Sequence, residues 1–239
     1  MPLVLSTVSR LTFFLVAFIL ASSPPAKAVC PAPEIPANSE FFKRDLVFTG
    51  SVLSFRELPD TDDAIGGWLY QVKVEKIFRG VARPAVEVFT ENSSIRFPLE
   101  KNREYLLFAD RRAGRFEIDN CGNSALISEA ADSLERLNRL LAGKQPSEIE
   151  GWIAAETGGI DVSGVLVTIK SQSKSYTAVT DKDGWFHFPA PPGRYKLDFS
   201  SKQYYLNGGD DFWYKPEGFV LHAGECASLQ VVSVRHLSK

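Results

Sequence analysis

Short segments with alternating apolar and polar residues run through most of the chain. Between residues 68 and 78, Tyr70 and Val72 alternate with Gln71 and Lys73, so one face is apolar and the other polar. A period of two residues is that of a β-strand. Similar segments lie at 45–55, 86–90, 104–110, 115–118, 149–155, 165–169, 174–180, 185–188, 195–199, 219–222 and 227–236. Strands this closely spaced and joined by turns predict a mainly all-β protein. Gly50, in the middle of the first strand, predicts a bulge or bend.

One segment has a helical period instead. Leu134, Leu137 and Leu141 recur at helical spacing within residues 128–143. Ser128 can cap the start of this helix, and Gly143 is a suitable end. We expect the apolar stripe to pack against the preceding strands rather than to bind a partner.

The prolines, turns and linker predicted from the sequence divide the chain into two parts. A linker at 144–147, which contains Pro146, separates residues 29–143 from residues 148–239. The prolines within 30–39 predict an extended, non-helical start to the first part. In the second part, the polar turn Asp181–Gly184 and the proline-rich turn at 189–193 frame two strands, and 201–218 is predicted to be a long loop.

The N-terminus has the pattern of an export signal. Arg10 precedes an apolar run from Leu11 to Ala21, and Ala26-Lys27-Ala28 fits a small-x-small cleavage pattern. The run is shorter than the ~20 residues of a membrane-spanning helix. We therefore expect cleavage after Ala28 and a secreted or periplasmic protein without a membrane span.

Composition narrows the function classes. Removing residues 1–28 leaves 25 basic and 29 acidic residues, a net charge of −4. An acidic chain is a poor ligand for the phosphate backbone, so we do not expect nucleic-acid binding. Disulfides are permitted in an exported chain, and three cysteines (Cys30, Cys121 and Cys226) allow one bridge and one leftover thiol. The residues alone leave the pairing open, including an intermolecular bridge through Cys226.

No catalytic or metal-binding motif stands out. None of the three histidines (His187, His222 and His236) has a second ligand at metal spacing, so each is interpreted as a strand-face residue. Asp181 and Asp183 resemble the start of a calcium loop, but a hairpin turn accounts for them better. We expect no enzyme activity, no metal and no cofactor. Asn92-Ser93-Ser94 fits the acceptor pattern for N-glycosylation.

The best functional hint in the second part is an aromatic cluster within the predicted loop. Aromatic side chains on a long loop can stack on sugars or anchor a protein partner, although they can also cover the end of a core. The ligand-binding candidates are Tyr204, Tyr205, Trp213 and Tyr214.

The second part resembles a known family. The segment Thr180–Phe188 (TDKDGWFHF), with Pro192–Leu197 (PGRYKL), Gly151 and the strand Val162–Val167, is similar to carboxypeptidase regulatory-like domains. The resemblance covers about residues 147–236. It implies a prealbumin-like β-sandwich that serves as a spacer or binding module and carries no active site.

The first part resembles a second family. The matching segments are Cys30, 45–50, 70–80, 105–109 and 121–124. Together they look like an OB-fold barrel of the tissue-inhibitor-of-metalloproteinases and netrin-like kind, with a terminal helix, over about residues 30–142. The resemblance implies a bridge between Cys30 and Cys121, which leaves Cys226 free.

Two functions follow as hypotheses. The first is an exported, non-enzymatic protein that binds an extracytoplasmic protein or glycan. The alternative is an inhibitor of zinc metalloproteases that acts through the Cys30 edge, because the terminal cysteine of the inhibitor family presents its α-amino group to the zinc. This chain has Cys30-Pro31-Ala32 in place of the Cys-x-Cys start, and cleavage after Ala28 leaves Val29 ahead of Cys30.

Overall fold

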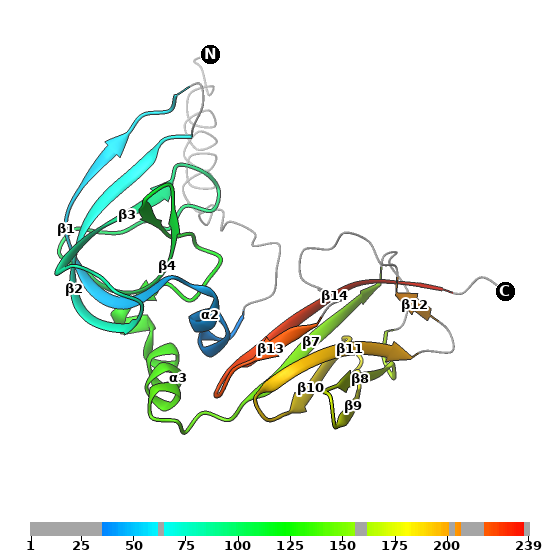
Figure 1. Ribbon diagram of the computed structural model, residues 1–239. Helices are drawn as coiled ribbons and strands as arrows, with labels where there is room; N and C mark the ends of the chain where they lie inside the picture. The colour runs from blue at the N-terminus through cyan, green and yellow to red at the C-terminus, as the bar shows by residue number, and fades with distance from the viewer. Residues whose placement is uncertain (1–34, 62–64, 156–161, 201–203, 207–217, 237–239) are drawn as a thin grey trace, which may run out of the picture.

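The computed structural model describes residues 35–61, 65–155, 162–200, 204–206 and 218–236, and it confirms a mainly β protein. Figure 1 shows two β-rich parts side by side, with the helices at Ala37–Lys43 and Ala131–Leu141 near their junction. Among the described residues, no helix has the length and apolar character needed to cross a membrane.

The first part is a sheet that closes on itself. Its elements are α2 (Ala37–Lys43), β1 (Leu46–Leu58), β2 (Gly67–Arg79), β3 (Ala85–Glu91), β4 (Glu104–Arg112), β5 (Arg115–Glu117), β6 (Ala125–Leu126), the 3-10 turn η1 (Ile127–Glu129) and α3 (Ala131–Leu141). The strand order is β1-β2-β3-β5-β4-β6, and β1 also pairs with β4. Strands β3 and β5 are parallel, and the other pairs are antiparallel. The alternating apolar residues fill the interior, among them Phe48, Tyr70, Val88 and Leu107.

Gly50 has the role that its position predicts. The β1–β2 register shifts between Thr49 and Gly50. A Cβ atom at Gly50 would lie 2.5 Å from the carbonyl oxygen of Lys73, so only glycine fits there. The resulting irregularity lets the long strand β1 bend and pair with β2 along one edge and β4 along the other.

The second part consists of two four-stranded sheets. Its strands are β7 (Glu148–Ala155), β8 (Leu166–Lys170), β9 (Ser175–Val179), β10 (Trp185–Pro189), β11 (Gly193–Ser200), β12 (Tyr204–Leu206), β13 (Phe219–Leu221) and β14 (Cys226–His236). One sheet has the order β10-β7-β14-β12 and the other has β13-β11-β8-β9. Side chains from both sheets form one core, which includes Ile149, Phe186 and Phe188 from the first and Val167, Ile169 and Tyr195 from the second.

The polar turn at Asp181–Gly184 forms, but it does not close a hairpin. Gly184 has φ +83°, and Asp181 Oδ1 accepts hydrogen bonds from the backbone N–H groups of Asp183 and Trp185, each at 2.9 Å. Strand β9 pairs with β8, whereas β10 pairs with β7. The hairpin interpretation is therefore wrong, because the turn carries the chain from one sheet to the other.

The expectation of a non-helical start is also wrong. Helix α2 begins directly after Pro36, at Ala37. A proline at the edge of a helix removes only an N–H group that has no partner within the helix, and its fixed φ suits the helix start. Burial then holds the short helix in place, since Ala37 and Phe41 pack against Leu137 of α3 and Phe108 of β4 in one cluster.

Helix α3 differs from its prediction at one end and matches it at the other. Ser128 lies in η1, and the N-cap position belongs to Ala130, which makes no side-chain capping bond. The predicted Ser128 cap is therefore wrong. At the other end, Gly143 has φ +66° and donates to the carbonyl of Leu140, and Lys144 N–H donates to Arg139 O, which is a Schellman ending.

Helix α2 also joins the two parts. The ring of Phe42 stacks on His222 with centroids 4.6 Å apart and planes 5° from parallel. Asn38 Nδ2 donates a buried hydrogen bond to the carbonyl of Gly224 at 3.0 Å. A Cβ atom at Gly224 would lie 2.4 Å from Leu140 Cδ1, so Leu140 of α3 packs closely against the same turn. The turn between β13 and β14 is thus held by the helices of the first part.

Candidate functional site

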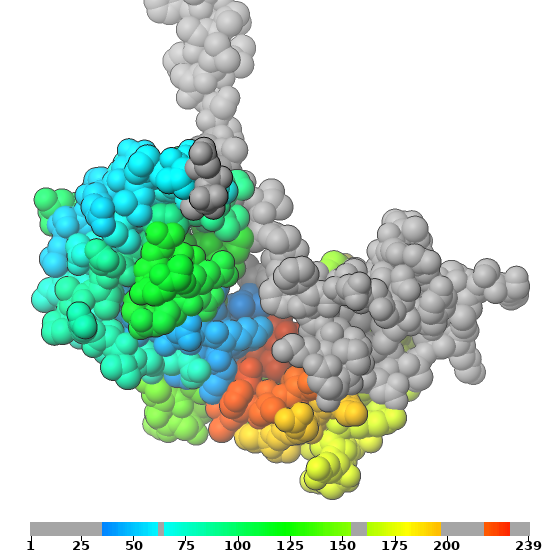
Figure 2. Space-filling model, turned by 45° about the horizontal axis from the view of Figure 1, so that its top comes forward, coloured from blue at the N-terminus to red at the C-terminus, as the bar shows by residue number. Residues whose placement is uncertain are grey.

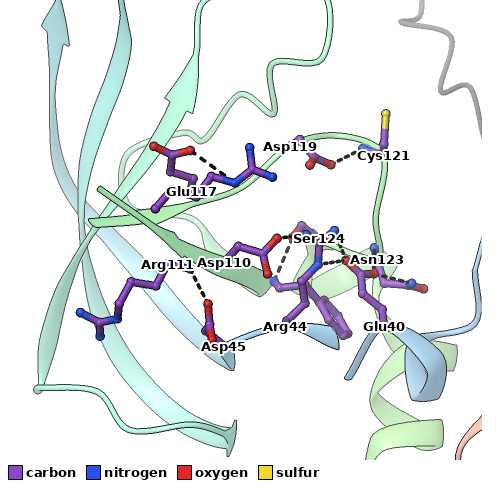
Figure 3. A network of polar contacts seen from close by, with 12 residues as sticks. Glu40, Arg44, Asp45, Asp110, Arg111, Glu117, Asp119, Cys121, Asn123 and Ser124 are labelled. Atoms are coloured by element: carbon purple, nitrogen blue, oxygen red, sulfur yellow. Dashed lines mark hydrogen bonds and ion pairs between the residues drawn. The ribbon is translucent and has the colours of Figure 1, made fainter. Parts of the chain in front are cut away.

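A network of buried charges lies where α2 meets the barrel (Figure 3). The side chain of Glu40 is 1% exposed and forms an ion pair with Arg44, with its Oε1 atom 2.7 Å from Arg44 Nη2. Arg44 Nη1 also lies 2.5 Å from Asp110 Oδ2 on β4. Burial by itself lowers the pKa of Arg44. The nearby carboxylates of Glu40 and Asp110 together have the larger effect, so the pKa of Arg44 is raised overall. The guanidinium therefore stays charged and ties the helix to the barrel.

The same glutamate fixes the loop that contains Cys121. Glu40 Oε2 accepts hydrogen bonds from the backbone N–H of Asn123 at 2.6 Å and from Asn123 Nδ2 at 2.7 Å. Asn123 Nδ2 also donates to the carbonyl of Ile35 at 2.8 Å. A Cβ atom at Gly122 would lie 2.3 Å from Glu40 Oε1, so the carboxylate can approach only because residue 122 is glycine. The loop and the chain entering from the N-terminus are held together.

Cys121 lies beside this network. Its backbone N–H donates to Asp119 Oδ1 at 2.8 Å, and its sulfur points away from the network in Figure 3. Cys30 lies outside the described residues, so the Cys30–Cys121 bridge stays a prediction. Ile35 is hydrogen-bonded to Asn123, which lies two residues after Cys121. Five residues can span about 17 Å, so the length of the chain between Cys30 and Ile35 permits the bridge.

A small hollow adjoins the loop on the barrel surface. Its volume is about 40 Å³. Its lining combines apolar residues (Phe89, Ile95 and Ile118) with charged ones (Glu91, Asp110, Arg112, Glu117 and Asp119). We call residues 119–124 together with this hollow the Cys121 edge. It combines a hydrogen-bonded backbone, several carboxylates and apolar side chains on one surface.

Cys226 has the properties of a structural thiol. It is a free cysteine, and it is fully buried. Burial raises the pKa of the Cys226 thiol well above its usual range, and Glu150 and Glu148 raise it further. A thiol of raised pKa stays protonated and reacts poorly, so Cys226 is unsuited to nucleophilic chemistry.

The four aromatic candidates are only partly described. Tyr204 and Tyr205 belong to strand β12, which pairs with β14, so the interpretation of 201–218 as one loop is wrong at these residues. Trp213 and Tyr214 lie outside the described residues. A role for the four in ligand binding stays a prediction.

Two of the three histidines, His187 and His222, lie against carboxylates. His187 Nε2 is 3.0 Å from Glu148 Oε2, and His222 Nδ1 is 2.7 Å from Glu225 Oε2. Within the part of the chain that the structure describes, no group of three or more His, Cys, Asp or Glu residues could hold a metal ion. Asn92 is exposed just after β3, as a glycan acceptor must be.

The resemblance of the first part pointed to residues 121–124, but sequence reasoning missed Glu40 and Arg44, which hold that loop in place. Glu40 follows a proline-rich start that predicts no helix, and no local pattern links it to Asn123. The one available signal was local: Glu40 and Arg44 stand four residues apart, which is the spacing of a helical ion pair. Comparisons with protein-family models and with curated proteins found no match for this chain.

Proposed function

We propose that this chain is an exported, non-enzymatic binding protein that contacts an extracytoplasmic protein or glycan through the Cys121 edge. The observation that carries the proposal is the buried network of Glu40, Arg44 and Asn123, which stiffens a surface loop from beneath. A contact surface that is rigid before binding loses less conformational entropy when the partner arrives.

We further propose that the first part is an OB-type barrel and the second a prealbumin-like sandwich. The order β1-β2-β3-β5-β4 with closure from β4 to β1, and the parallel pairing of β3 with β5, support the barrel. Two antiparallel-rich sheets sharing one core support the sandwich. Both architectures are typical of modules that bind rather than catalyse.

A charge reversal at the edge tests the proposed function. Arg112 borders the hollow with its side chain 68% exposed, so Arg112→Glu changes the contact surface without disturbing the core. We expect immobilised wild-type protein to retain a partner from the extracytoplasmic fraction of the source organism, and Arg112→Glu to retain about tenfold less. The readout is quantitative mass spectrometry of the retained proteins and glycans.

The matched control lies at the other end of the same strand. Arg103, whose side chain is 50% exposed, immediately precedes β4, whereas Arg112 ends it. Arg103→Glu makes the same charge change and should retain the partner as the wild type does. Equal loss in both variants, or no loss in either, would contradict a role for the Cys121 edge.

One observation also favours inhibition of a zinc metalloprotease as a second candidate. Asn123 ties Ile35 to the Cys121 loop, so the segment that carries Cys30 starts from a fixed point on the barrel. Such anchoring is what a bridged, inhibitory N-terminus requires. The candidate also needs a free α-amino group on Cys30.

The unreduced intact mass of the exported protein decides between the two candidates. We expect a chain that begins at Val29 and is lighter by the two hydrogens of one disulfide, because Ala28 completes the cleavage pattern. That result leaves no α-amino group on Cys30 and removes the inhibitor candidate. A chain that begins at Cys30 supports it, and a panel of zinc endopeptidases then tests it against Cys30→Ala.

A further inference from the structure

Two tryptophans face each other on the outer surface of one sheet. Trp152 of β7 and Trp185 of β10 are directly opposite in the antiparallel register. Their neighbours Ile153 and Phe186 point into the core, so both indole rings lie on the outer face. Directly opposite side chains have Cβ atoms about 5 Å apart, so the two indoles project from neighbouring positions on this face.

The pair is held in place and remains accessible. Trp152 Nε1 donates to the carbonyl of Asp183 at 2.9 Å, which fixes the orientation of this half-buried ring. The backbone N–H of Trp185 donates to Asp181 Oδ1 at 2.9 Å, so the start of β10 is fixed by the same turn. Trp185 itself is 37% exposed. The two rings form an ordered apolar surface that the described part of the chain leaves partly uncovered.

Polar groups with fixed positions lie on the same face. His187 is next to Trp185 on the outer side of β10, is 55% exposed, and is 3.0 Å from Glu148. Glu150 is directly opposite His187 and one outward position from Trp152. Burial raises the pKa of Glu150 above its usual range. Imidazole and carboxyl groups thus stand beside the aromatic surface, where His187 also pairs with Glu148 and Glu150 with the thiol of Cys226.

The first part of the molecule covers only one end of this face. Cys226, directly opposite Glu148 on β14, is fully buried, and α2 packs against β14 there. Exposure rises away from the helices, from the buried Cys226 to the partly exposed Trp185. The face therefore has a closed end at the helices and an open end at the tryptophans.

We propose that this outer face, the Trp152–Trp185 face, binds an uncharged glycan chain. The C–H faces of pyranose rings stack on the indole rings, and the hydroxyl groups of the sugar pair with His187 and Glu150. The carboxylates of Glu148 and Glu150 repel uronic acids and sulfated sugars, so like-charge repulsion leaves neutral or N-acetylated rings as the favoured ligands. This site is separate from the Cys121 edge and does not depend on it.

Binding of soluble oligosaccharides to the full-length mature chain tests the proposal. The probes are cellohexaose and chitohexaose, with oligogalacturonate as an anionic comparison, and the readout is isothermal titration calorimetry. We expect at least one neutral hexasaccharide to bind, oligogalacturonate not to bind, and Trp185→Ala to weaken the affinity about tenfold or more. Affinity for the neutral hexasaccharide should stay unchanged in 0.5 M salt, because an uncharged ligand has no ionic attraction to the protein that salt could screen.

Matched variants keep the result interpretable. Phe55→Ala removes another exposed ring, 47% exposed and located on the barrel, and should leave glycan affinity unchanged. Glu150→Gln keeps the size of the side chain, removes its charge, and should reduce selectivity against oligogalacturonate. Absence of binding by the wild type, or equal affinity in Trp185→Ala, would overturn the proposal. Arg112→Glu should bind the glycan as the wild type does. A failure of glycan binding at the Trp152–Trp185 face can therefore be distinguished from a failure of partner binding at the Cys121 edge.

Discussion

Replacing Glu40 by alanine is expected to lower the free energy of unfolding by about 3–5 kcal/mol, because removal of one partner leaves buried charge and buried donors without compensation. The carboxylate is 1% exposed, Arg44 is 17% exposed, and Glu40 is also the acceptor for both nitrogen donors of Asn123. In the variant, Arg44 keeps only Asp110 as an ionic partner. Urea denaturation followed by circular dichroism measures the change.

An exposed glutamate provides the control for this substitution. Glu100 pairs with Arg103 at 3.8 Å, and its side chain is 69% exposed. Solvent screens such a pair, so Glu100→Ala should change the free energy of unfolding by less than about 1 kcal/mol. If Glu40→Ala were no more destabilising than Glu100→Ala, the network would not stabilise the Cys121 edge, and the stiffness on which the proposed function rests would be refuted.

Replacing Leu137 by alanine is expected to cost about 2–5 kcal/mol, the range for deleting a fully buried leucine side chain. Leu137 is 0% exposed and packs with Phe41, Phe78 and Phe108 between the helices and the barrel. Three aliphatic carbons (Cγ, Cδ1 and Cδ2) and their contacts are lost, and rigid aromatic neighbours can collapse into the space only partly. The midpoint of urea denaturation should fall with little change in the slope of the transition.

Leu141, on the same helix, is the matched control. It is 53% exposed, so Leu141→Ala removes little buried surface and should stay within about 0.5 kcal/mol of the wild type. Alanine is the better helix former, so neither substitution costs helix propensity. Equal losses in the two variants would show that α3 does not pack as described.

Local patterns in the sequence determined most of the strands. The period of two in 68–78 and the apolar alternation around Phe186 required no knowledge of distant residues, because alternation follows from the pleat of a single strand. Gly143 and Gly184 were also predictable, since each supplies a positive φ at a chain reversal. The helical spacing of Leu134 and Leu137 located α3 in the same way.

Tertiary structure decided what those elements do. Helix α2 is too short to be stable alone and forms because Ala37 and Phe41 are buried against the barrel and α3, so local propensity could not reveal it. Which helical leucine is buried likewise depended on the shape of its neighbours.

Both candidate sites arise from contacts between distant segments. Glu40 meets Asn123 across 83 residues, and Trp152 meets Trp185 through strand register. Alternation determines which side chains of one strand share a face, but it does not determine which strands become neighbours or in what register they pair. Those choices depend on the burial of the whole core and on loop closure. The sequence by itself therefore determined the elements of this protein and their faces, and only the tertiary structure brought the residues of the Cys121 edge and the Trp152–Trp185 face together.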